Sequence, residues 1–466
     1  MRYISTRGKA PVLNFEEVVL TGLARDGGLY LPESWPQFSH DDIQSLAGMR
    51  YAEAAAFLLQ PFLGDSIEAA DFHAMTEKAY TAFSHEAVVP IRQMGANDFL
   101  MELYHGPTLA FKDVALQLLG LLYDHLLARQ GKRVTIIGAT SGDTGSAAIE
   151  ACRGREAVDI FILHPKGRVS EVQRRQMTTV LDANVHNIAV EGDFDDCQAM
   201  VKAMFNDHDF RDSLAVSAVN SINWAREMAQ IVYYFTAAVS LGGPARPVSF
   251  SVPSGNFGDV YAGYAASRMG LPVEQLIVAT NRNDILSRFF NSGEYRKAGV
   301  DPTISPSMDI QVSSNFERYL ADLYGRDGAA VSELMARLDS DGGFVIDRLR
   351  LNDSLFAAGK CGEAETIETI RRTFEETGTL VDPHTAVGLF AGQNCRKDSH
   401  IPLVTLSTAH PAKFPDAVEK ATGERPALPK HMSDLFAREE RFAQLPNDIE
   451  TVKSYIRERA RILAPH

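Results

Sequence analysis

A lysine in an apolar turn is the first side chain of this sequence whose setting suggests chemistry. Lys112 lies in the segment HGPTLAFKD, residues 105–113, immediately before a predicted apolar helix. Burial and the positive end of a helix dipole both lower the pKa of an amine, and only the free amine attacks a carbonyl. Lys112 is therefore a candidate imine-forming residue, and the alternative is a lysine that covers apolar surface at a helix end.

Two polar, glycine-containing loops each connect an apolar strand to a helix. The first is ATSGDTG at 139–145 and the second is SGNFGD at 254–259. Backbone N–H groups at a helix N-terminus bind a phosphate or a carboxylate, although Ser, Thr and Asp are also common helix caps. Neither loop is a Walker A or GxGxxG sequence. We expect both loops at the carboxyl ends of strands of one sheet, where they predict one ligand with two anionic ends or two adjacent ligands.

Two further stretches place polar groups at the ends of predicted elements. The stretch NSINWAR, 220–226, opens a helix and puts Arg226 in its first turn, where a positive charge opposes the helix dipole. A bound anion would explain that charge, and a surface salt bridge is the alternative. The stretch STAHPAK, 407–413, follows an apolar strand, so the Thr408 hydroxyl either binds a ring nitrogen or closes a turn. It also contains a second lysine, Lys413.

Composition excludes several classes of protein. Lys and Arg number 46 against 60 Asp and Glu, a net charge of −14, and without a basic run nucleic acid is not an expected partner. No apolar stretch reaches the ~18 to 20 residues of a membrane span, so a membrane is not expected either. The four cysteines are far apart, which predicts no disulfide framework and no metal site. The amino-terminal residues lack a signal- or transit-peptide pattern, so we expect a cytoplasmic protein.

The elements that must position these residues follow an α/β pattern. From Asn97 onward, short apolar strands alternate with amphipathic helices, which predicts parallel sheets flanked by helices. Strands are expected over 134–138, 159–163, 185–190, 248–252, 276–279 and 403–406, and helices from near Asp113, Ser146, Glu171, Asp195, Asn223, Asp259 and Asp284. We expect a small N-terminal domain over 1–90, a catalytic region of two lobes over 91–416 and a C-terminal helical ending over 417–466. A helical segment at about 308–378 would pack on the sheet or form a lid.

Six motifs, in this order and spacing, resemble the longer-chain bacterial and fungal threonine synthase family: HGPTLAFKD, GATSGDTGSAA, HPKGRVSEVQRRQM, NSINWAR, VPSGNFGD and STAHPAKF. The resemblance runs from Arg2 to about Asp416. It implies the fold of the fold-type II, tryptophan synthase beta-like enzymes with pyridoxal 5'-phosphate as cofactor. It also implies a lyase that converts O-phospho-L-homoserine and water to L-threonine and phosphate, the last step of threonine biosynthesis.

The resemblance further implies a role for each site residue. Lys112 would be the catalytic lysine that carries the cofactor as an imine, and Thr408 would face the ring nitrogen. The phosphate of the cofactor would be held by Ser254 and Asn256 with the backbone N–H groups of Gly255, Phe257 and Gly258. The substrate carboxylate would bind Thr140, Ser141, Gly142, Asp143 and Thr144, and the substrate phosphate would bind Asn220, Ser221, Asn223 and Arg226. Many fold-type II relatives carry Asn at the position of Asp143, so the hydrogen bond near the phenolic oxygen of the cofactor stays open.

Other activities compete with this interpretation. A pyridoxal-phosphate-dependent phospholyase, or a serine or threonine dehydratase giving a 2-oxo acid, shares the early chemistry. Residues 220–226 argue against a dehydratase of an unphosphorylated substrate, but they do not separate the chain from a phospholyase. A nucleotide- or NAD-binding protein would need GxGxxG, and a metabolite sensor would not need Lys112. The sequence leaves monomer or homodimer undecided.

Overall fold

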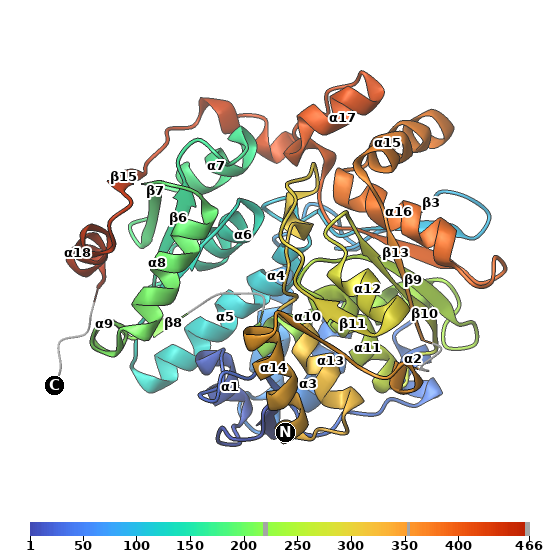
Figure 1. The fold of residues 1–466 in the computed structure, drawn as a ribbon, viewed down its shortest axis with the longest axis horizontal. Helices are drawn as coiled ribbons and strands as arrows, with labels where there is room; N and C mark the ends of the chain where they lie inside the picture. Colours follow the sequence, from blue (N-terminus) through green and yellow to red (C-terminus); the bar gives the residue numbers. More distant parts are fainter. Residues whose placement is uncertain (218–221, 352–354, 462–466) are drawn as a thin grey trace.

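Two sheets, each with helices packed against it, organise the residues that the computed structural model describes, 1–217, 222–351 and 355–461 (Figure 1). Across the larger sheet the strands are β13 (Phe356–Lys360), β10 (Val273–Thr280), β9 (Val248–Pro253), β14 (Leu403–Ser407), β4 (Asp98–Glu102) and β3 (Ile91–Gln93). Across the smaller sheet they are β15 (Ala443–Pro446), β7 (Val185–Glu191), β6 (Val158–Pro165), β5 (Val134–Ala139) and β8 (Val216–Ser217). Within these two sheets the β3–β4 pair is antiparallel and the other pairs are parallel. The predicted α/β class is confirmed.

Side chains of the larger sheet divide between its two faces with the period of two that a strand imposes. In β10, Leu276 and Val278 belong to the main core, and Ile277 and Ala279 belong to a second cluster. Helix α16 (Pro383–Cys395) supplies Val387 to that second cluster. The larger sheet and the helices around it form one lobe of the molecule. Its remaining elements are α11 (Gly258–Arg268), α12 (Ile285–Ser292), β11 (Glu294–Arg296), η1 (Pro306–Met308), α13 (Phe316–Leu323), α14 (Gly328–Ser340), β12 (Gly343–Val345), η2 (Arg348–Leu351) and α15 (Glu363–Thr377).

The smaller sheet is divided in the same way. In β6, Ile160 and Ile162 join the main core, whereas Phe161 and Leu163 pack in a separate cluster. The helices of this lobe are α6 (Asp143–Cys152), α7 (Glu171–Thr178), α8 (Phe194–Asn206) and α9 (His208–Ser213). Both sheets are therefore buried on two faces, as parallel sheets require.

Two long helices, α5 (Lys112–Gln130) and α10 (Trp224–Ser240), pack on each other between the lobes (Figure 1). The N-terminal elements are β1 (Tyr3–Ser5), α1 (Phe15–Thr21), β2 (Tyr30–Pro32), α2 (His40–Ser45), α3 (Tyr51–Leu63) and α4 (Ala69–Tyr80). Of these, α4 packs on α5 and α3 packs on α10. Their buried residues belong to the main core, so the predicted N-terminal region is continuous with the core of the catalytic region.

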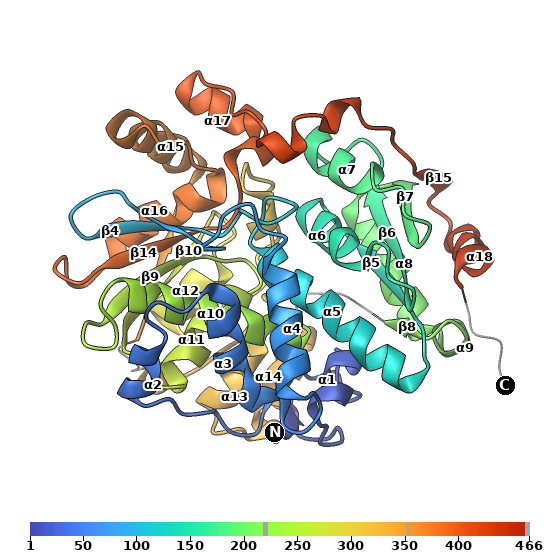
Figure 2. The same cartoon turned by 180° about the vertical axis from the view of Figure 1, so that it is seen from behind.

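The structure differs from the sequence predictions in two segments. The C-terminal tail, predicted to be helical, contains α17 (Pro415–Thr422) and α18 (Ile449–Arg459), but also β15, which pairs with β7 as an edge strand. Figure 2 shows this tail running along the outside of the molecule from α17 to α18. The segment 308–378, predicted to be mostly helical, contributes β13 to the larger sheet, and its helix α15 packs on α16. No helix within the described ranges is long and apolar enough to cross a membrane.

Candidate active site

The two glycine loops follow β5 and β9 and therefore belong to different sheets, so the prediction that both lie in one sheet is wrong. They meet instead across the short helix η1. The Ser307 hydroxyl of η1 donates to Asp143 Oδ2 in the first loop at 3.4 Å. The Ser307 carbonyl oxygen lies 2.9 Å from the point where a Cβ atom on Gly255 of the second loop would stand. The loops thus approach each other from the two lobes.

Lys112 is the first residue of α5 and is buried. Its Nζ lies 3.8 Å from Asp143 Oδ2 and 4.6 Å from the centre of the Phe111 ring. Burial lowers the pKa of Lys112, with Asp143 acting in the opposite direction and Lys413 and Arg226 adding to the decrease. The direction predicted from the sequence is confirmed, and a buried amine with a lowered pKa suits imine formation.

Thr408, the residue after β14, is hydrogen-bonded to Phe111, the residue that precedes Lys112. Its carbonyl oxygen accepts a hydrogen bond from Phe111 N–H at 2.8 Å, and Ala409 forms an isolated bridge with Ala110. Only 6% of Thr408 is exposed. The motifs HGPTLAFKD and STAHPAKF are therefore joined through their backbones.

Asp143 opens α6 and is buried between two lysines. Its Oδ1 accepts from Lys413 Nζ and from Gln173 Nε2, each at 2.8 Å. Burial would raise the pKa of the Asp143 carboxyl, but Lys413 and Lys112 outweigh burial and hold that pKa below its usual value. Sequence reasoning gave no role to Lys413 or Gln173. The sequence carries no signal for this contact, because these residues stand in separate motifs.

The first loop uses Thr140 for its own structure. The buried Thr140 hydroxyl accepts from the N–H groups of Gly142 and Gly145, each at 2.9 Å. Gly142 has φ of 144°, a conformation that other residues rarely adopt. Ser141 is exposed and Thr144 is half-buried at the start of α6. Ser141 and Thr144 are therefore the hydroxyls of this loop that remain accessible.

The second loop is fixed by neighbouring backbone and hydroxyl groups. Phe257 has a left-handed φ of 63°, and its N–H donates to Ser254 Oγ at 3.1 Å. The carbonyl oxygen of Gly255 accepts from Ser313 Oγ at 2.6 Å, and that of Asn256 accepts from Asn315 N–H at 3.0 Å. The N–H of Phe257, which the resemblance implies as a phosphate donor, is thus already engaged. Gly258 opens α11, and the first N–H groups of a helix have no intrahelical partner.

Arg226, in the first turn of α10, is buried with only 3% of its surface exposed, so the alternative of a surface salt bridge is wrong. Its Nε and Nη1 have no hydrogen-bond partner within the described part of the chain. Burial lowers the pKa of Arg226, which the nearby Glu227 and Asp259 carboxyls oppose. Two donors of a buried guanidinium are therefore available to an anion.

The other residues predicted around Arg226 have different positions. Asn223 is the N-cap of α10: its side-chain oxygen accepts from Ala225 N–H at 2.9 Å, and its Nδ2 donates to the Val19 carbonyl at 2.8 Å. The side chain of Asn223 thus fixes the start of the helix that carries Arg226. Asn220 and Ser221 lie outside the described residues.

A buried Asp–His pair, which sequence reasoning missed, is hydrogen-bonded to η1. His384 Nδ1 lies 2.6 Å from Asp382 Oδ2, and Ser307 N–H donates to His384 Nε2 at 3.2 Å. Because Nε2 accepts, Nδ1 carries the proton and donates to the carboxylate. Asp382 also caps α16. The Asp-Pro dipeptide at a helix start is the signal that the sequence offers, and it predicts a cap rather than a site.

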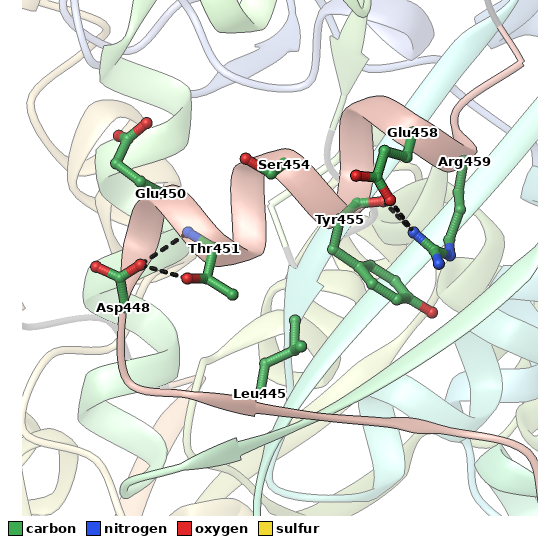
Figure 3. A pocket seen from close by; sticks show the side chains of 8 residues that line it. All are labelled: Leu445, Asp448, Glu450, Thr451, Ser454, Tyr455, Glu458 and Arg459. Atoms are coloured by element: carbon green, nitrogen blue, oxygen red, sulfur yellow. Dashed lines mark hydrogen bonds and ion pairs between the residues drawn. The ribbon is translucent and has the colours of Figure 1, made fainter.

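A separate surface hollow lies between β15 and α18 and is lined by Leu445, Asp448, Glu450, Thr451, Ser454, Tyr455, Glu458 and Arg459 (Figure 3). None of these residues carries a predicted role. The polar groups around Lys112, not this hollow, form the candidate active site.

The donors of that site fit a phosphorylated aldehyde cofactor and an anionic substrate. Lys112 is a buried amine, Gly258 of the second loop opens helix α11 with its first N–H groups, and Arg226 has two buried donors without a partner in the described ranges. An aldehyde needs the first, a closely held phosphate the second, and a further anion the third.

Comparisons with known proteins cover nearly the whole chain. The family models "Threonine synthase N terminus", "Pyridoxal-phosphate dependent enzyme" and "Threonine synthase, C-terminal" match residues 2–80, 87–348 and 385–456. The threonine synthase of Pseudomonas aeruginosa is 58% identical over 98% of each chain. The crystal structure of pyridoxal-phosphate-bound threonine synthase from Brucella melitensis has a TM-score of 0.97 and 56% identity, over 99% of this chain and 100% of that one. The yeast threonine synthase structure has a TM-score of 0.94 and 40% identity, over 98% of each chain. The chain therefore belongs to the threonine synthase family of pyridoxal-phosphate-dependent enzymes.

Proposed function

We propose that this protein converts O-phospho-L-homoserine and water to L-threonine and phosphate, with Lys112 as its catalytic lysine and Arg226 as a ligand of the substrate phosphate. Membership of the family supports the reaction. The observation that carries the assignment of the substrate is the buried Arg226, because a guanidinium donor without a partner is costly in a protein interior. A phosphate would satisfy the donors that the described residues leave unpaired.

Pyridoxal 5'-phosphate, when bound, supplies an electron sink that acidifies first Cα and then Cβ of an amino-acid substrate. Lys112 would hold it at the aldehyde carbon and Thr408 would lie at its ring nitrogen. Its phosphate would lie at the loop 254–258, where Gly258 opens helix α11 and Gly255 lets the loop pack against η1. This arrangement would place a neutral hydroxyl, not a carboxylate, beside the ring nitrogen.

The side chains of the site then divide the remaining work. The Lys112 amine, once free, takes the proton from Cα and later from Cβ, and burial, which lowers its pKa, favours the unprotonated form that this role needs. The first loop, through Ser141, Thr144 and the N-terminus of α6, binds the substrate carboxylate. Arg226 stabilises the negative charge that grows on the phosphate as it leaves from Cγ.

The test compares Arg226→Ala and Arg226→Lys with the unaltered enzyme. Losing a charged, bidentate contact to a buried phosphate costs ~2 to 4 kcal/mol, so Arg226→Ala should lower kcat/KM for O-phospho-L-homoserine roughly 30- to 1000-fold. Arg226→Lys keeps the charge but not the bidentate geometry, and its activity should fall between the two. The change in cofactor absorbance on adding L-homoserine, which lacks the phosphate, should persist in both variants.

Three results would contradict the proposal. An equal loss with both amino acids would make Arg226 a structural residue, and no loss would place the phosphate elsewhere, with Lys166 or Arg168 as the next candidates. Release of a 2-oxo acid in place of L-threonine by the unaltered enzyme would favour the phospholyase alternative. We also propose a cytoplasmic location, which fractionation of the host cell would test.

A further inference from the structure

The site contains a second buried lysine that the proposed function does not use. Lys413, in η3 (Pro411–Lys413), is completely buried. Its Nζ lies 2.8 Å from Asp143 Oδ1 and donates to the carbonyl oxygen of Thr108 at 2.7 Å. Lys112 Nζ lies 3.8 Å from Asp143 Oδ2, beyond the ~3.2 Å of a typical hydrogen bond. Of the two lysines, Lys413 is therefore the one in direct contact with the carboxylate.

We propose that Lys413 is a positioning residue: it holds the Asp143 carboxylate through Oδ1 and thereby leaves Lys112 as the free amine that reacts with the cofactor. This inference rests on the proposed function, because it takes Lys112 as the imine-forming lysine. It assigns Lys413 a role through Asp143, without contact with the reacting atoms.

The charges around Lys112 come from four elements. Asp143 on α6 and Asp259 on α11 favour its protonated form, whereas Lys413 on η3 and Arg226 on α10 oppose it. Asp259 is itself engaged, because the Tyr233 hydroxyl donates to it. Removing the charge of Lys413 would leave Asp143 with Lys112 as its nearest cation. The protonated form of Lys112 would then be favoured, and the free amine would become scarce.

The charged groups that interact with Lys413 include Lys112 and the carboxyls of Asp143 and Asp113. Asp113, on α5, accepts from Thr108 N–H at 2.8 Å and from Thr108 Oγ1 at 2.7 Å. Burial raises the pKa of Asp113 to about 6, against the opposing effects of Thr108 and Lys413. Asp113 thus has its own hydrogen-bond donors, and Asp143 is the carboxylate that forms an ion pair with Lys413.

The experiment measures how fast the full-length protein, freed of cofactor, takes up pyridoxal 5'-phosphate as a function of pH, followed by absorbance. Lys413→Met removes the charged amine and keeps an unbranched side chain that reaches as far as Cε. It should slow uptake about tenfold at neutral pH and move the pH of half-maximal rate up by about one unit. Lys413→Arg keeps the charge and should restore most of the rate.

The double variant Asp143→Asn with Lys413→Met separates this role from a structural one. Because no carboxylate is left to form an ion pair with Lys112, the rate of cofactor uptake should return toward that of the unaltered protein. The pH of half-maximal rate should fall below that of Lys413→Met. Equal impairment of the double variant and of Lys413→Met would overturn the inference, as would an unchanged pH profile in Lys413→Met. If urea denaturation shows that Lys413→Met does not fold, the single variant Asp143→Asn is measured in its place. The inference requires the pH of half-maximal uptake in Asp143→Asn to be lower than in the unaltered protein, and an equal or higher value refutes it.

Borohydride reduction and peptide mapping keep this inference distinct from the proposed function. A pyridoxyl label on Lys112 together with an unchanged pH profile would overturn the role of Lys413 alone. A label on Lys413 would overturn both assignments.

Discussion

Replacing Gly255 by alanine should weaken binding of the cofactor while leaving the fold in place. The added methyl group would stand 2.9 Å from the Ser307 carbonyl oxygen and 3.1 Å from Met308 Cα. Both are backbone atoms of η1, so no side-chain rotation relieves the contact. The Ser313 hydroxyl holds the Gly255 carbonyl on another side at 2.6 Å. The φ of Gly255 is not positive, so the effect comes from contact alone.

The magnitude follows from the cost of overpacking. An extra methyl group forced against well-packed atoms costs about 1 to 3 kcal/mol. The free protein would relieve part of this cost by moving the loop, but in the proposed site binding of the phosphate requires the loop in its original position. Since ~1.4 kcal/mol corresponds to a tenfold change, the dissociation constant of pyridoxal 5'-phosphate should rise by up to about 5- to 140-fold.

The assay titrates cofactor-free protein with pyridoxal 5'-phosphate and measures unfolding by urea in parallel. Gly138→Ala is the matched control, because its methyl group would meet only the flexible Ile162 Cδ1, at 3.3 Å. Gly138 lies in β5, away from the second loop. An unchanged dissociation constant in Gly255→Ala would refute the assignment of this loop. A fall in stability as large as the fall in affinity would make the loop purely structural.

Three more predictions concern the rest of the site and its support. Lys112→Ala should keep the urea midpoint within experimental error yet abolish both turnover and borohydride trapping of the cofactor; residual trapping at another lysine would contradict it. Asp382→Asn removes a buried acceptor from the cap of α16, so the free energy of unfolding should fall by about 1 to 3 kcal/mol, and an unchanged urea midpoint would oppose this role. Glu102 is buried, which would raise its pKa, but His105 and Arg92 outweigh burial and lower that pKa from 4.5 to about 2. Since the unfolded chain binds this proton more tightly, stability should fall as the pH drops from about 4.5 toward 2, and Glu102→Gln should flatten that fall in urea midpoints measured against pH.

Local patterns in the sequence were sufficient for much of the fold and part of the site. The six predicted strands are present, each within a few residues of its expected ends, because apolar residues with short polar breaks favour strands wherever they occur. Lys112 and both glycine loops stand at the element ends where the sequence places them. Strand β13, FAAGK, was missed, because Ala and Gly have low strand propensity and β13 gains its conformation from pairing with β10.

The tertiary structure alone decided which of these residues meet. The sequence by itself identified a lysine, two loops with the pattern of anion sites and an arginine in an unfavourable place, because helix starts, turns and apolar runs are properties of a few neighbouring residues. The order of strands decided that the loops belong to two sheets and face each other across Ser307. The packing of the elements buries Arg226 and places His384 within hydrogen-bond distance of Ser307 in η1. It also brings Lys413 to the carbonyl oxygen of Thr108, 305 residues away in the sequence. Contacts over such separations depend on how whole elements pack, and residue periodicities of 2 and ~3.6 do not encode that packing.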